Sequence, residues 1–95
     1  MNKKDIKIGQ IVRSEQGRDE GQYYLVLKVN DNSANLVDGK AKKLDNPKKK
    51  NIAHLQATSV INTEIANKIT NNIKINDQII YHSLYEYKKE LKGSK

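Results

Sequence analysis

Short apolar runs separated by turn-forming residues occupy the first 57 positions of the chain. The clearest runs lie at residues 10–14, 23–29 and 35–37, with a tight turn expected at 30–33. Alternation over 23–29 places the odd-numbered side chains on one strand face, expected to be core, and Tyr24 and Val26 on the other. The pattern predicts short β-strands, and the 23–29 strand is expected to be covered on both faces over part of its length.

Two more strands follow from weaker patterns. Asp38 and Gly39 form a pair that favours a two-residue hairpin, because both positions tolerate positive φ, so a strand is expected over 40–44. A polar loop over 47–51 then leads to a closing strand over 52–57. Five short strands in about fifty residues favour a small barrel, since closure removes exposed sheet edges.

The apolar spacing lengthens from two to about four residues after position 60. A short helix is predicted after a capping Asn62, with apolar positions at Ile61, Ile65 and Ile69. A second helix is predicted from a capping Asn76 to Gly93, with apolar positions at Ile80, Leu84, Tyr87 and Leu91. The fold class is therefore mainly β, with a small barrel over residues 1–58 and a helical extension over 59–95 packed on it.

The net charge and the residue types that are absent limit the classes of function expected for the chain. Eighteen Lys and Arg against eleven Asp and Glu give a net charge of +7, which favours polyanions such as nucleic acid, with simple solubility as the alternative. Cysteine is absent, and His54 and His82 lie in different segments, so no metal site, cofactor, small-molecule substrate or enzymatic activity is expected. No export signal and no apolar run of about 20 residues is visible, so a cytoplasmic, non-membrane protein is expected.

The segment from Gly9 to Gly39 resembles the KOW motif of ribosomal proteins and transcription elongation factors. A glycine precedes an apolar strand, a Gly-basic-Asp-x-Gly turn follows at residues 17–21, and a third apolar strand ends in Asp38-Gly39. The later stretch 47–55, with its lysines and a His-Leu pair, resembles the continuation seen in the bacterial KOW-domain relatives of the ribosomal L14e/L6e/L27e group. The resemblance covers roughly residues 6–58 and implies an SH3-like barrel that binds ribosomal RNA in the translation machinery.

The candidate RNA-binding residues are Arg13, Gly17, Arg18, Gly21, Lys42, Lys48, Lys49, Lys50 and His54. Gly17 and Gly21 allow positive φ and close backbone approach, and Arg18 stands where its guanidinium can bond a phosphate bidentately. The plainer alternatives are a turn in which Asp19 bonds local amides, and a solvated lysine loop. Tyr23 and Tyr24 are expected to serve core packing before base stacking.

A different class of function also fits the pattern. SH3-like barrels and KOW domains dock onto proteins, so a protein-interaction module of the translation or transcription machinery is the alternative to RNA binding. Ribosomal proteins are the partners that this alternative implies. The apolar helix from Ile79 would then offer a partner surface, and Tyr81, Tyr85 and Tyr87 are expected to serve packing or that surface before nucleobases.

Overall fold

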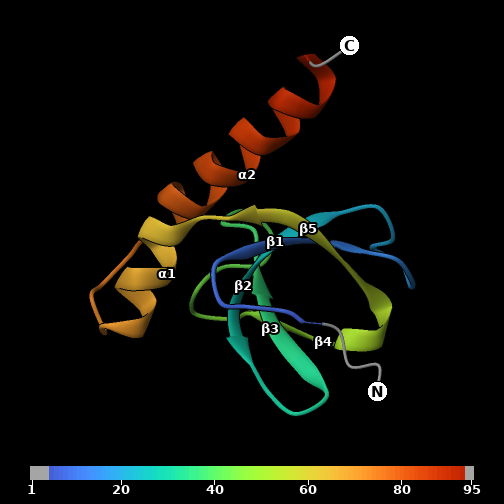
Figure 1. The fold of residues 1–95 in the computed structure, drawn as a ribbon, viewed down its shortest axis with the longest axis horizontal. Coiled ribbons are helices and arrows are strands. Elements are labelled where there is room, and N and C mark those ends of the chain that lie inside the picture. The colour runs from blue at the N-terminus through green and yellow to red at the C-terminus, as the bar shows by residue number, and fades with distance from the viewer. Residues whose placement is uncertain (1–4, 94–95) are drawn as a thin grey trace.

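The computed structural model describes residues 5–93. Residues 1–4, which begin the predicted barrel and the segment used for the export prediction, lie outside the described residues. Residues 94–95, which end the predicted helical extension, also lie outside them. The strands are β1 (Gln10–Ser14), β2 (Tyr23–Val29), β3 (Ser33–Val37), β4 (Lys48–Asn51) and β5 (Leu55–Ile61). A 3-10 turn, η1 (Ile52–His54), precedes β5, and the helices α1 (Thr63–Thr70) and α2 (Asp77–Gly93) follow it (Figure 1). The described chain is mainly β with a helical extension, as the sequence predicts.

All strand pairs are antiparallel, in the order β4-β3-β2-β1-β5. Ile11 pairs with Leu25 across β1 and β2, and Leu25 pairs in turn with Val37 of β3. The first and last strands of this order pair on one side only within residues 5–93, so the predicted barrel is not closed between β4 and β5. Register shifts in β1 and β2 mark irregular positions that bend a strand locally.

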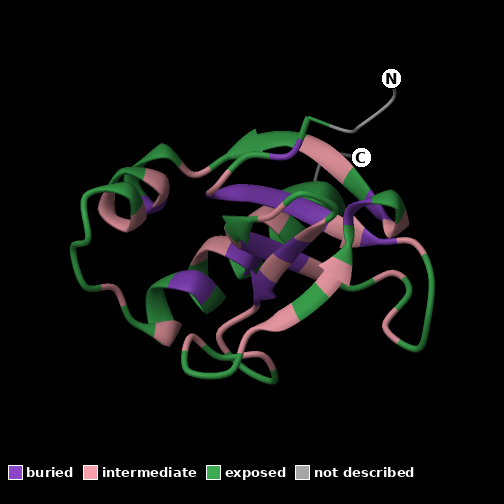
Figure 2. Ribbon diagram, turned by 90° about the horizontal axis from the view of Figure 1, so that it is seen from below, coloured by how far each residue is buried: buried purple, intermediate pink, exposed green. Residues whose placement is uncertain are grey.

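The sheet has apolar clusters on both faces, as predicted for its second strand. The inner cluster contains Ile6, Val12, Tyr24, Val26, Ala34, Leu36, Ile52 and Leu55. The outer cluster contains Ile11, Leu25, Val37, Ile65, Ile80 and Leu84, so α1 and α2 supply half of its buried members (Figure 2). On the predicted core face of β2, Leu25 is buried and Tyr23 and Leu27 are half-buried, whereas Val29 is exposed. Burying one such aliphatic side chain contributes roughly 1.5–3 kcal/mol, so the helical extension stabilises the sheet that it covers.

Both helices begin where the sequence predicts. The side chain of Asn62 accepts a hydrogen bond from the Ile65 amide at 3.0 Å, and that of Asn76 accepts one from Ile79 at 2.9 Å. Each bond satisfies one backbone donor that the first helical turn leaves unpaired. No helix within residues 5–93 is long and apolar enough to cross a membrane.

The predicted hairpin at Asp38-Gly39 and the strand over 40–44 are wrong. Residues 38–47 form a loop in which Asp38 Oδ1 accepts hydrogen bonds from the amides of Lys40 and Lys42, at 2.9 and 2.7 Å. The Leu44 amide donates to Asp77 Oδ1 at 2.8 Å, which fastens the loop to the first turn of α2. Local aspartate bonds of this kind compete with strand pairing, and the 40–44 segment has no apolar face to oppose them.

The predicted lysine loop is also wrong, since residues 48–51 form strand β4 against β3. The closing strand starts at Leu55 instead of Ile52, because residues 52–54 turn as η1, and it continues to Ile61 past the predicted boundary at residue 58. Ile52 still joins the inner cluster from η1. Apolar residues alone therefore located this part of the core but not its backbone conformation.

Candidate nucleic-acid interface

The connection between β1 and β2 is a tight turn built around two glycines. Gly17 and Gly21 have φ of 94° and 91°, a backbone region that L side chains rarely adopt. The Gly21 amide donates to the Ser14 carbonyl at 2.8 Å, and the Glu20 amide donates to Gly17 at 3.2 Å. The Gly-basic-Asp-x-Gly pattern of the sequence thus forms a folded-back loop whose tip carries Arg18.

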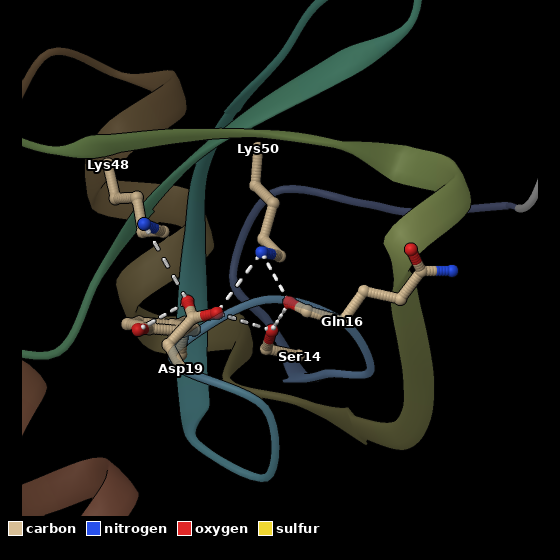
Figure 3. Close-up of polar contacts among 6 residues, drawn as sticks. Ser14, Gln16, Asp19, Lys48 and Lys50 are labelled. Carbon is tan, nitrogen blue, oxygen red and sulfur yellow. Dashed lines mark hydrogen bonds and ion pairs between the residues drawn. The ribbon is translucent and has the colours of Figure 1, made fainter.

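Asp19 fixes this turn to three strands (Figure 3). Its carboxylate accepts hydrogen bonds from Ser14 Oγ at 2.8 Å and from the Tyr24 hydroxyl at 2.8 Å. Lys50 of β4 donates a third bond at 3.1 Å, and the Lys48 ammonium lies 3.8 Å away. The Asp19 side chain is only 14% exposed, so one mostly buried carboxylate links β1, β2 and β4.

The same contacts set the pKa of Asp19. Burial raises this pKa, but the hydrogen bonds from Ser14, Tyr24 and Lys50 outweigh it and lower the value from 3.8 to about 2. Burial and the Asp19 carboxylate raise the pKa of the Tyr24 hydroxyl, so this hydroxyl stays protonated and donates. The charged carboxylate therefore receives three side-chain donors at neutral pH.

A lowered carboxyl pKa predicts acid sensitivity of the fold. The stabilisation is present above the unfolded pKa of 3.8 and is lost as the pH falls towards about 2. Discounted for solvent screening, it amounts to about 1–2 kcal/mol. The difference in unfolding free energy between wild type and Asp19→Asn should shrink by this amount between about pH 5 and pH 2, measured by urea unfolding. A difference that does not change with pH would show that the charge of Asp19 does not stabilise the turn.

The three consecutive lysines have different environments because β4 is pleated. Lys50 is 11% exposed and also donates to the Gln16 carbonyl at 2.9 Å, so it holds the turn. Lys48 is 31% exposed and shares Asp19 with it. Lys49 points to the other side and is exposed. The alternative in which all three lysines are solvated in a loop is therefore wrong, and Lys49 is the most accessible of them.

The two arginines differ in their ion pairing. Arg13 forms an ion pair with Glu15, and the hydrogen bond and charge of Glu15 raise the pKa of its guanidinium. Its Nη2 lies 3.8 Å from where a Cβ on Gly21 would stand, which places Arg13 beside the turn. Arg18 is exposed, and within the described part of the chain it forms no ion pair. Arg18 is thus the cation that the turn presents to solvent.

The remaining candidates are divided between two places. His54 ends η1, and its carbonyl accepts a hydrogen bond from the Glu15 amide at 2.8 Å, so it adjoins the turn. Lys42 lies in the 38–47 loop, which is fastened to α2. The structure therefore gathers eight of the nine candidates around residues 13–21 and β4, and Lys42 lies in a different loop.

Sequence reasoning missed the role of Asp19 as the centre of the site. The expected alternative had Asp19 bonding local amides, whereas its partners are side chains of Ser14, Tyr24 and Lys50. A hydroxyl residue five positions before and a tyrosine five positions after the aspartate form the only local signal, and the lysine partner lies 31 positions away. No group of three or more metal-ligating side chains is placed to hold a metal within residues 5–93.

No protein-family model matches this chain, and no curated protein matches it significantly.

Proposed function

We propose that this protein binds structured RNA, with ribosomal RNA as the leading candidate, through the turn at residues 17–21 and the adjoining strand β4. The observation that carries the proposal is the charge balance at this place. Two ammonium groups, of Lys48 and Lys50, share the single carboxylate of Asp19, Arg18 is exposed at the tip of the turn, and Lys49 is exposed on the other side of β4. The cations exceed the carboxylate that pairs with them, so a polyanion gains from binding here.

Each part of the surface has a defined task in this proposal. Asp19 and Lys50 hold the turn in one conformation, which reduces the ordering cost of binding. Gly17 supplies the positive φ that folds the turn back beside the Lys50 ammonium. Arg18 offers a planar guanidinium for bidentate phosphate contact, and Lys49 offers a mobile ammonium. Contacts of this kind recognise the shape of a folded RNA backbone more than its base sequence.

The proposal predicts a change in salt dependence for the exposed cations. Arg18→Gln and Lys49→Gln should each reduce the slope of log affinity against log salt by roughly 0.7–0.9, because each removes about one phosphate contact. Fluorescence anisotropy with a labelled RNA hairpin at several salt concentrations measures this slope. Lys50→Gln is a poor test because it also removes the bonds of Lys50 to Asp19 and Gln16.

Lys74→Gln is the matched control for this measurement. Lys74 is exposed in the connection between α1 and α2, away from the turn, and its replacement lowers the net charge equally (Figure 1). The control should leave the slope nearly unchanged. An equal loss of slope in Lys74→Gln would mean that net charge alone drives binding, and an unchanged slope in the Arg18→Gln/Lys49→Gln double variant would contradict the proposed surface.

A further inference from the structure

Two tyrosines on α2 are stacked on each other and open to solvent. The rings of Tyr81 and Tyr85 lie 6.4 Å apart between centroids with an interplanar angle of 23°. Tyr81 is 43% and Tyr85 is 50% exposed. The other tyrosines differ, since Tyr24 is buried on Asp19 and Tyr87 packs edge-on against Tyr23 at 5.3 Å. The sequence favoured packing or a partner surface for Tyr81 and Tyr85, but packing uses only part of either ring.

Two lysines lie beside this exposed pair. A hollow of about 190 Å³ is lined by Tyr81, Tyr85, Lys40, Lys88, Gln22 and Tyr23, among others. Lys40 and Lys88 are exposed and form no ion pair within residues 5–93. Asp38 also lines the hollow, but its Oδ1 already accepts two backbone amides. The hollow therefore combines aromatic faces with unpaired ammonium groups.

The loop that carries Lys40 is held firmly against α2. A Cβ built on Gly39 would lie 2.3 Å from the Asp77 carbonyl and 2.8 Å from the Tyr81 amide, so the two backbones are in close contact there. The Lys40 amide donates to Asp38 in the same loop. Lys40 is thus fixed beside Tyr81 by backbone contacts. This placement starts the exposed Lys40 side chain from a fixed backbone position near Tyr81.

The hollow is continuous in sequence with the proposed RNA surface. Gln22 and Tyr23 line it, and they directly follow the turn that ends at Gly21. Arg13, beside that turn, pairs with Tyr23 across β1 and β2. An RNA strand that leaves the turn can therefore reach the tyrosines by crossing the first residues of β2.

We infer that the hollow receives an unpaired nucleobase, which stacks on Tyr85 and Tyr81 while Lys40 and Lys88 contact its flanking phosphates. This inference rests on the proposed function and narrows its substrate class to folded RNA with a bulged or looped-out base near the bound backbone. Aromatic faces accept any base by stacking, and neighbouring cations hold the phosphates. Aromatic rings with two lysines against the one carboxylate of Asp38 suit a nucleic acid better than an apolar protein surface.

The test compares two RNA hairpins of equal length and charge, one with a single bulged uridine and one with an abasic residue at that position. The wild-type protein should bind the uridine hairpin on the order of 10-fold more tightly. Tyr85→Leu should abolish this preference and leave the salt slope unchanged, whereas Tyr85→Phe should keep it. Binding is measured by anisotropy, and quenching of tyrosine emission gives a second readout because the chain contains no tryptophan.

The outcomes separate this inference from the function on which it rests. Equal wild-type affinity for the two hairpins, with an intact salt slope, would overturn base stacking and leave phosphate binding standing. A preference that persists in Tyr85→Leu would assign the tyrosines to another surface, such as a protein contact, and would also overturn the inference. Loss of binding to both hairpins in the wild type would overturn both proposals.

Discussion

Asp19→Asn is expected to lower the free energy of unfolding by about 2–4 kcal/mol, because it removes the charge at which three side-chain donors meet. Lys50 would keep its ammonium at an 11% exposed position with only the Gln16 carbonyl as a hydrogen-bond partner. The NH2 of the new amide would also oppose one of the donors from Ser14 and Tyr24, which bond to different oxygens of the carboxylate. Urea unfolding at neutral pH measures the loss.

Asp45→Asn is the matched control for this substitution. It changes the net charge equally, and Asp45 is an exposed residue of the 38–47 loop. Its unfolding free energy should change by less than about 0.5 kcal/mol, as surface substitutions usually do. Equal, small effects of the two substitutions would contradict the role given to Asp19.

Gly39→Ala is expected to destabilise the protein by about 3 kcal/mol or more, through two separate costs. Gly39 has φ of 79°, which costs an L residue about 1–2 kcal/mol. Its added methyl would also lie 2.3 Å from the Asp77 carbonyl, an impossible approach to backbone. The loop and the first turn of α2 must then separate, which weakens the outer cluster around Ile80. Thermal and urea unfolding both report this loss.

Gly17→Ala isolates the first of these costs, that of the positive φ. Gly17 has φ of 94°, but a methyl there would meet only the flexible Lys50 ammonium at 3.4 Å and Asp19 Oδ1 at 3.6 Å. The variant should therefore lose only about 1–2 kcal/mol, the cost of the backbone conformation. Equal losses for Gly39→Ala and Gly17→Ala would show that the contact between the loop and α2 is not tight.

Sequence patterns predicted the elements whose stability is local or strongly apolar. The β1 and β2 strands and both helices follow from alternation, four-residue spacing and the capping asparagines at 62 and 76. The conformation of residues 40–51 was not predicted correctly, because it depends on partners that are distant in the sequence. Leu44 is held by Asp77, 33 positions away, and Lys50 by Asp19, 31 positions away. A run of lysines has no apolar face, so nothing local indicates that it forms a strand.

The sequence predicted where the candidate site lies, but not which of its side chains hold the turn and which are free to bind a ligand. The glycine turn was located from its motif, and the structure places Arg18 at its exposed tip. Sequence spacing treats Lys48, Lys49 and Lys50 alike, whereas the pleat of β4 turns two of them to one carboxylate and the third to solvent. Which cation is free for a ligand depends on a tertiary ion pair, which a single sequence does not reveal.

Amide chemical shifts during titration with an RNA hairpin test the proposed interface most directly. In the uniformly ¹⁵N-labelled protein at low salt, the largest shift changes should fall on residues 17–21 and on β4. The connection between α1 and α2, around Lys74, should show little change. Shift changes confined to that connection and to α1, with the glycine turn unmoved, would contradict the account.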